Sequence, residues 1–329
     1  MYARLFVLHI ENKGNDNGDI KMVPLTVFTP AYNRADLLPR CYESMKRQTN
    51  KEFIWMIIDD GSTDGSLKIL REYEKNDPRV TVIDQENKGV SVARNVGIEL
   101  ALQSKCEFIT FMDSDDYLTD DSLETVVKWE ATIAGKPGYC GVAGNRGSSP
   151  TETPNTSLMS MYGSNYIDEY AFVRYPEYTD KVVDGERAGV WYTEIHRKYK
   201  YPEFEGENFL TPCIVWNRMA RDGYKIRIFE DIIWVCKYLQ DGLTMQGNMR
   251  FIKNPAGHGL SIREKAEFLH DPLIKKMKMW YTFYCDHTFC EEQYRLTMKQ
   301  CAEYIGAPLV MIWCAAAARK LLHFVKGKK

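Results

Sequence analysis

The chain has 329 residues, of which 44% are hydrophobic and 27% charged, and its formal net charge is −2. These values are ordinary for a globular protein with a sizeable core, and the near-neutral charge argues against nucleic-acid binding. Nine cysteines are scattered without a CxxC pair, a pattern typical of a reduced, cytoplasmic protein rather than of a disulfide framework. No run reaches the ~18–20 apolar residues that a membrane-spanning helix needs.

Strand and helix patterns alternate through the first half of the chain. Residues 1–21 precede this alternation, and because no small-residue cleavage site follows their short apolar part, we expect a flexible N-terminal extension. The alternation predicts an α/β protein with a doubly wound, mainly parallel sheet flanked by helices. Apolar, β-branched runs predict strands over 23–29, 52–58, 80–83 and 108–112, and helical spacing predicts helices over 35–48, 64–75 and 90–102.

Three of the four predicted strands end in polar clusters, at 29–33, 59–62 and 113–116. Because the carboxyl ends of parallel strands lie along one edge of a sheet, we expect these clusters to converge. The last cluster places three carboxylates within four residues, and their repulsion must be compensated by a cation or by hydrogen-bond donors. A divalent ion with oxygen ligands, Mg²⁺ or Mn²⁺, fits this requirement best.

The chain lacks both G-x-G-x-x-G and G-x-x-x-x-G-K-[ST], so neither common phosphate-binding fingerprint is present. The segment 87–95 is another candidate, because Gly89 permits close backbone approach and opens a predicted helix whose N-terminus attracts phosphate. Arg94 follows about one turn later and is placed to pair with a diphosphate. Taken alone, the segment fits an ordinary loop and helix start equally well.

The second half is less regular. Residues 144–165, rich in Ser, Thr, Pro, Gly and Asn, predict a loop or weak domain boundary. Beyond them we expect a helix over 209–222, strands over 225–229 and 232–238, and helices from Glu264 onward.

Together the polar segments resemble the family 2 glycosyltransferases. Segments 29–34, 57–66, 87–95 and 111–116 occur in family order with family-like spacing. The resemblance implies a GT-A fold and the transfer of a sugar, with inversion, from a nucleotide diphosphate donor, usually a UDP-sugar. The acceptor would be a hydroxyl of a glycan or a lipid-linked molecule, in cell-surface polysaccharide assembly.

The resemblance also implies a division of the chain. It assigns 22–140 to the nucleotide-sugar-binding half, 141–262 to the acceptor-binding and catalytic-base half of the same domain, and 263–329 to a helical C-terminal extension. The residues that it implies for donor binding are Pro30, Tyr32, Asn33, Asp60, Lys88, Gly89, Arg94, Asp113 and Ser114.

Within this site the resemblance implies a metal ion bound by Asp115, bridging the two phosphates of the donor. Asp116 is either a second ligand or a helix-capping residue. The ion, Mn²⁺ or Mg²⁺, would neutralise charge on the departing nucleoside diphosphate.

Residues 201–210 resemble the later acidic motif of the family, which often ends in an aspartate that acts as the general base. Here that position is Asn208, which cannot serve as a base. We therefore expect Glu207 to take the acceptor proton, with Glu205 as the second candidate. An acidic loop on a solvated surface is the alternative interpretation.

The glycine-rich segment 253–259 contains a central histidine, His258. It is either an ordinary loop or a lid over the donor phosphates, in which case His258 would be a third metal ligand.

An apolar run at 309–318 includes Trp313, and no acidic residue follows Glu303. This pattern fits either a helix lying peripherally on the inner face of the cell membrane or a packed C-terminal helix with a solvated tail. The basic residues that follow the run are Arg319, Lys320, Lys326, Lys328 and Lys329.

Two other functions remain open from the sequence. A sugar-phosphate nucleotidyltransferase would need a glycine-rich, basic loop after the first strand, whereas that loop contains only Arg34. A non-catalytic nucleotide- or glycan-binding module is favoured by Asn208 alone.

Overall fold

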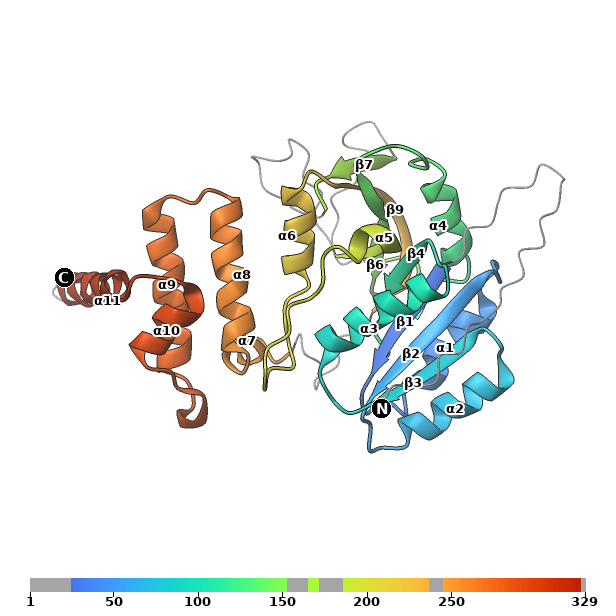
Figure 1. The fold of residues 1–329 in the computed structure, drawn as a ribbon, viewed down its shortest axis with the longest axis horizontal. Helices are drawn as coiled ribbons and strands as arrows, with labels where there is room; N and C mark the ends of the chain where they lie inside the picture. Colours follow the sequence, from blue (N-terminus) through green and yellow to red (C-terminus); the bar gives the residue numbers. More distant parts are fainter. Residues whose placement is uncertain (1–24, 153–164, 172–185, 237–244, 327–329) are drawn as a thin grey trace. The chain divides into compact units, whose positions relative to one another are not determined.

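The computed structural model describes residues 25–152, 165–171, 186–236 and 245–326, with side chains as far as Ala317 (Figure 1). The predicted extension 1–21 lies outside the described residues, as do parts of the predicted loop and strand at 144–165 and 232–238 and the side chains of the basic tail.

The chain divides into two compact units. Unit 1 comprises Met1–Lys200 and Asp222–Lys237, and unit 2 comprises Tyr201–Arg221 and Tyr238–Lys329. The division expected after residue 140, between two halves of one domain, falls inside strand β6 (Tyr139–Gly147). The start expected for the C-terminal extension, after residue 262, falls inside helix α8 (Pro255–Phe268).

Unit 1 is built on a mixed nine-stranded sheet, one half of which is parallel in the order β3-β2-β1-β4. The four strands predicted in the first half are all present. All eight residues of β2 are buried, as expected for a parallel strand covered on both faces. The parallel strands are β1 (Leu25–Ala31), β2 (Phe53–Asp60), β3 (Val80–Gln85) and β4 (Phe108–Phe111).

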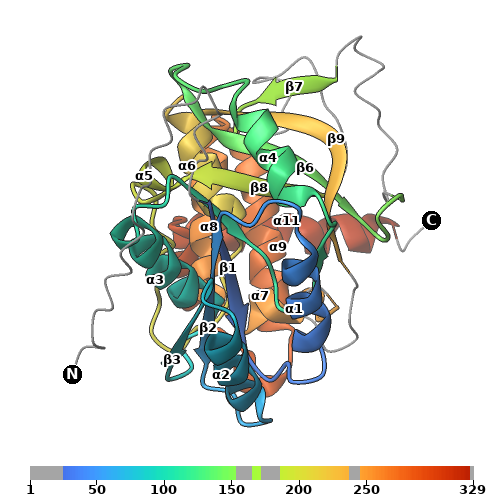
Figure 2. The same ribbon diagram turned by 90° about the vertical axis from the view of Figure 1, so that its right-hand side faces the viewer.

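Helices cover both faces of this parallel half. Helices α1 (Leu38–Arg47), α2 (Ser66–Asn76) and α4 (Ser122–Glu130) share one hydrophobic core with β1 and β2. Helix α3 (Val90–Gln103) lies on the opposite side of the β1–β2 pair from α1 (Figure 2). There a Cβ atom on Gly97 would lie 2.3 Å from the ring of Phe28, so only glycine permits this approach.

The other half of the sheet is mainly antiparallel. Strand β8 pairs antiparallel with β4 and β6, and β9 pairs parallel with β6 and antiparallel with β5 and β7. The two strands predicted over 225–229 and 232–238 form one strand, because the polar pair Glu230-Asp231 is accommodated by a register shift against β6 rather than by a break. Residues 144–147 belong to β6, so the first part of the predicted loop was wrong. The bounds are β5 (Tyr117–Leu118), β7 (Tyr166–Glu169), β8 (Arg187–Tyr192), β9 (Lys225–Val235) and, after β8, α5 (Thr193–His196).

Unit 2 is helical in its described residues, as predicted from Glu264 onward. Its core contains Trp280, Phe283, Ile305 and Ile312, which lie on three different helices. The ion pair between Arg218 and Glu264, at 2.6 Å, joins α6 to α8. The remaining helices are α6 (Cys213–Arg221), α7 (Met249–Ile252), α9 (Leu273–Thr288), η2 (Glu292–Tyr294), α10 (Met298–Ile305) and α11 (Leu309–Lys326).

Candidate functional site

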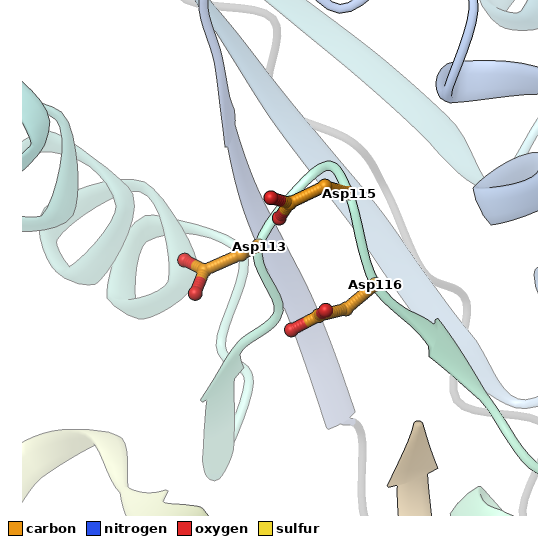
Figure 3. Close-up of side chains that lie close together, drawn as sticks. All are labelled: Asp113, Asp115 and Asp116. Carbon is orange, nitrogen blue, oxygen red and sulfur yellow. The ribbon is translucent and has the colours of Figure 1, made fainter. Parts of the chain in front are cut away.

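Three aspartates project from the loop that follows β4 (Figure 3). Asp113, Asp115 and Asp116 each offer a carboxylate oxygen within 4.8 Å of the others, and within the described residues they form the one group of acidic, His or Cys side chains close enough to hold a metal ion. The loop is tight because the Asp116 N–H donates to the carbonyl of Asp113 at 3.1 Å. Arg40 on α1 also donates to the carbonyl of Asp115.

Asp116 is buried against a cation and an indole. Its Oδ2 accepts hydrogen bonds from Arg146 Nη2 and Trp234 Nε1, both at 2.7 Å, and the Arg146 guanidinium lies 4.8 Å from the centre of the Trp234 ring. The register of β6 and β9 places Arg146 opposite Trp234. The helix-capping role considered for Asp116 was wrong, because this residue precedes β5 whereas α4 begins at Ser122.

Sequence reasoning missed Arg146 and Trp234. Arg146 lies in a segment whose composition predicted a loop, and Trp234 lies in a run that predicted only a strand. Both residues reach the site because β9 pairs with both β5 and β6, and this long-range pairing leaves no local pattern in the sequence.

Asp113 is partly open to solvent, with 41% of its side chain exposed. Arg94 Nη2 lies 3.7 Å from its Oδ1, and Arg146 Nη2 lies 3.9 Å from its Oδ2. The structure therefore brings the start of α3 and the end of β4 together, as the convergence of polar segments predicted. Ser114, in the same loop, is buried.

Burial and mutual repulsion disfavour the ionised form of the cluster, although arginines lie close by. Burial, and then the charge of Asp113, raise the pKa of Asp115 above its usual value. Burial raises the pKa of Asp116 to about 7, with Asp113 and Asp115 adding to the effect and Arg146 opposing it. An additional cation would therefore stabilise the ionised cluster.

The loops after β1 and β2 are linked by Asn33. Its N–H donates to Ser62 Oγ at 2.9 Å, and its Oδ1 accepts from the Thr63 N–H at 2.8 Å. Asn33 has a φ of 52°, in the left-handed region that asparagine tolerates better than most residues. Pro30 is compatible with its place in a central strand because β1 pairs with β4 only as far as Phe28. Tyr32, with 47% exposure, is open to solvent.

Asp60 at the end of β2 fixes the start of α3. Its carboxylate accepts from the N–H groups of Lys88 at 3.0 Å and Gly89 at 2.9 Å, and from Gln85 Nε2 at 2.7 Å. Gly89 adopts a φ of 83°, which favours glycine. Since a carboxylate has about four acceptor positions, these bonds leave room for one donor, such as a base N–H. The role of Asp60 in binding the nucleotide base stays a prediction.

Glu207 in unit 2 caps a helix. Its Oε1 accepts from the Ala256 N–H at 2.6 Å and its Oε2 from the Gly257 N–H at 2.9 Å, at the start of α8. Asn254, the residue just before α8, accepts hydrogen bonds at its Oδ1 from the N–H groups of Asn208 and Phe209, at 2.8 and 3.1 Å. Burial raises the pKa of Glu207, although its two backbone hydrogen bonds oppose the shift. Glu205 is exposed.

The segment 253–259 is not a loop, so the lid interpretation was wrong. Helix α8 begins at Pro255, in the first turn, where proline is well tolerated. Gly257 and Gly259 are needed there for close contact, since a Cβ atom on Gly259 would lie 2.6 Å from the carbonyl oxygen of Tyr304.

His258 lies on α8 and faces α9. Its Nδ1 is 3.2 Å from His287 Nε2, and its ring packs between Phe251 and Phe283. Burial lowers the pKa of both histidines to about 4. The metal-ligand role of His258 stays a prediction, and these contacts do not support it.

Comparison with known proteins gives several matches. EpsH of Bacillus subtilis (strain 168) is 39% identical over 197 residues, covering 60% of this chain and 46% of that protein. The chondroitin synthase of Escherichia coli is 41% identical over 110 residues, covering 33% of this chain and 16% of that protein. The chain therefore spans less than half the length of these relatives.

Two solved structures share the fold at low sequence identity. S. aureus TarS 1–349, in complex with UDP, has a TM-score of 0.51 and 15% identity, covering 91% of this chain and 92% of that chain. The mannosyltransferase PcManGT of Pyrobaculum calidifontis, in complex with GDP-Man and Mn²⁺, has a TM-score of 0.50 and 18% identity. The match covers 92% of this chain and 79% of that chain.

The likeness to these structures confirms the predicted GT-A fold. The family model for glycosyl transferase family 2 matches residues 26–201, which is more than half of the chain and includes all four polar segments. The chain belongs to glycosyl transferase family 2.

Proposed function

We propose that the protein is a metal-dependent, inverting glycosyltransferase, a hexosyltransferase that uses a nucleotide-sugar donor, most simply a UDP-sugar. The observation that carries the proposal is the acidic cluster at the end of β4, where three carboxylate oxygens lie within 4.8 Å of one another beside Arg94 and Arg146. UDP in the TarS complex supports the choice of nucleotide.

The donor would lie along the polar segments of unit 1. Asp60 holds the backbone at Gly89, and the N–H groups that follow in the first turn of α3 would favour a phosphate. Arg94 supplies a guanidinium for the diphosphate, and Lys88, just before α3, is exposed. Tyr32 offers an exposed ring for stacking on the base.

The acidic cluster fits a hard divalent cation, Mn²⁺ or Mg²⁺, because all its ligand atoms are carboxylate oxygens. Asp115 and Asp113 would hold the ion, with Asp116 oriented by Arg146 and Trp234. When bound there, the ion would neutralise charge that develops on the leaving diphosphate.

We propose Glu207 as the general base and Glu205 as its alternative. The acceptor hydroxyl oxygen would bond to the anomeric carbon while the bond from that carbon to the diphosphate oxygen breaks. The diphosphate keeps the electron pair, and the carboxylate takes the proton. The assignment rests on the sequence motif and on the raised pKa of Glu207, which makes it a stronger base than an ordinary glutamate.

A glycan or lipid-linked acceptor, and a role in cell-surface polysaccharide assembly, are proposals supported by relatives named as chondroitin and hyaluronan synthases. All nine cysteines are free, which supports the proposal of a cytoplasmic location.

The second candidate is a non-catalytic binding module. It is favoured by two observations: both oxygens of Glu207 accept hydrogen bonds from α8, and the next residue is Asn208. Such a module would bind the nucleotide without transferring its sugar.

Release of UDP from a panel of UDP-sugars, with Mn²⁺ and oligosaccharide acceptors, tests both candidates. Glu207→Gln should lower turnover by about 100-fold or more while leaving UDP affinity unchanged. Asn254→Ala is the matched control, because it disturbs the same contact with α8 but removes no carboxylate. Normal turnover by Glu207→Gln would exclude Glu207 as the base, and UDP binding without turnover of any donor would favour the binding module.

A further inference from the structure

Helix α11 exposes three large apolar side chains near its start. Leu309, Val310 and Trp313 are 46%, 60% and 61% exposed. At 100° per residue these positions fall within one 100° arc, so they share one face of the helix. Ile312, outside that arc, is fully buried in the core of unit 2. The helix therefore packs on the protein with one side and presents apolar side chains with another.

The charge of the following sequence differs from that of the rest of the chain. The whole chain is nearly neutral, at −2, yet no acidic residue follows Glu303 and five lysines and arginines lie between 319 and 329. An exposed apolar face is thus followed directly by a basic segment. This combination complements an anionic lipid surface in both hydrophobicity and charge.

We propose that this face of α11 docks on the surface of an anionic bilayer. Leu309, Val310 and Trp313 would enter the interface between headgroups and acyl chains, a position that suits an indole ring. The positive charge of the sequence that follows would add electrostatic attraction to the anionic headgroups. A second copy of the chain is the less favoured occupant, because it would add like charge rather than opposite charge.

Docking on the surface agrees with the packing of α10. Within the described residues no single helix is long and apolar enough to cross a membrane, although α10 and the first part of α11, bent by 119°, meet the length and composition criteria together. Cys301, Ala302 and Ile305 of α10 are buried in the core of unit 2. Helix α10 therefore packs in the core of unit 2, whereas α11 exposes the apolar face formed by Leu309, Val310 and Trp313.

Sedimentation of the full-length protein with vesicles tests the proposal, using phosphatidylcholine alone or with phosphatidylglycerol. Wild type should pellet with the anionic vesicles and be released by high salt. Val310→Ser with Trp313→Ser should weaken binding at least about tenfold, whereas Met245→Ser with Phe289→Ser, two other exposed apolar positions of unit 2, should not. Because the four positions are exposed, both variants should keep the wild-type melting temperature.

A second measurement does not depend on a polar substitution. Brominated lipids should quench part of the wild-type tryptophan fluorescence, and Trp313→Phe should bind equally well but lose that quenched part. The proposal is overturned if wild type ignores anionic vesicles, if both serine variants lose binding equally, or if the α11 substitutions only dissociate a dimer. The assay contains no nucleotide, so its failure is distinct from failure of the proposed transferase activity.

Discussion

Units 1 and 2 stabilise their ionisable side chains in different ways. In unit 1, Asp113 and Asp116 face the guanidinium groups of Arg94 and Arg146, and still the pKa values of Asp115 and Asp116 are raised by burial and mutual repulsion. A bound cation would therefore favour the ionised form of the cluster.

In unit 2, Glu207 and a pair of histidines contact polar groups of the same unit. Glu207 accepts two backbone hydrogen bonds from α8, and His258 and His287 face each other as neutral rings. The comparison teaches that clustering of polar residues is not enough to identify a ligand site. A site for a cation is better indicated by neighbouring carboxylates that repel one another, as in unit 1.

The largest effect is expected from Arg146→Met. It should lower the free energy of unfolding by about 3 kcal/mol at pH 8, because it leaves Asp116 buried without its ion-pair partner. Urea unfolding measures the loss, which should be smaller at pH 6, where Asp116 can be protonated.

The matched control is Arg47→Met, since Arg47 pairs with Asp120 at 2.9 Å but both side chains are about half exposed. Its cost should stay below about 1 kcal/mol. Equal losses from the two variants would show that the buried pair contributes no more than a surface pair.

An effect of at least about 2 kcal/mol is expected from the histidine pair as the pH falls. The folded-state pKa values are lowered to about 4, below an unfolded value of ~6.5. The unfolded chain therefore binds more protons between these values, so this stability is complete above ~6.5 and is lost as the pH falls towards 4.

Unfolding free energies of wild type and of His258→Gln with His287→Gln, measured from pH 7.5 to 4.5, isolate this contribution. Asp116, whose pKa is raised to about 7, acts with the opposite sign in both proteins and cancels in the difference. A difference that does not change with pH would contradict the neutral histidine pair.

A smaller effect, about 1–2 kcal/mol, is expected from Gly97→Ala in unit 1 and Gly259→Ala in unit 2, because each adds a methyl group where another atom lies too close. The obstacles differ: a ring carbon of Phe28 at 2.3 Å, and the backbone oxygen of Tyr304 at 2.6 Å. Thermal unfolding should show that Phe28→Leu partly rescues Gly97→Ala, whereas Tyr304→Leu does not rescue Gly259→Ala. Rescue of both variants would contradict the prediction that the backbone of Tyr304 limits the space at Gly259.

The parallel half of the sheet was predictable because each of its elements has a clear pattern within a short stretch of sequence. Strands β1 to β4 are apolar runs with polar residues at their carboxyl ends, and the helices between them have regular apolar spacing, so the convergence at Asp113 followed from topology alone. Arg146 could not be predicted, because its place opposite Trp234 depends on a register shift between strands about ninety residues apart.

At the start of α8 the sequence predicted a loop where the structure has a helix. Pro255, Gly257 and Gly259 have the composition of a loop, but a proline in the first turn favours a helix and the two glycines allow close packing against Glu207 and Tyr304. The acceptor of those helix N–H groups, Glu207, lies about fifty residues earlier in the chain. Local composition therefore misled where long-range contacts decide the structure.

The central claim is that the acidic cluster of unit 1 binds a nucleoside diphosphate through a divalent ion. Calorimetric titration of UDP into the protein, with and without Mn²⁺, tests it most directly when repeated with Asp115→Ala and with the exposed control Asp120→Ala. Wild type and Asp120→Ala should bind UDP at least about tenfold more tightly with Mn²⁺, and Asp115→Ala should lose this gain. UDP binding that is indifferent to both the ion and Asp115 would contradict the claim.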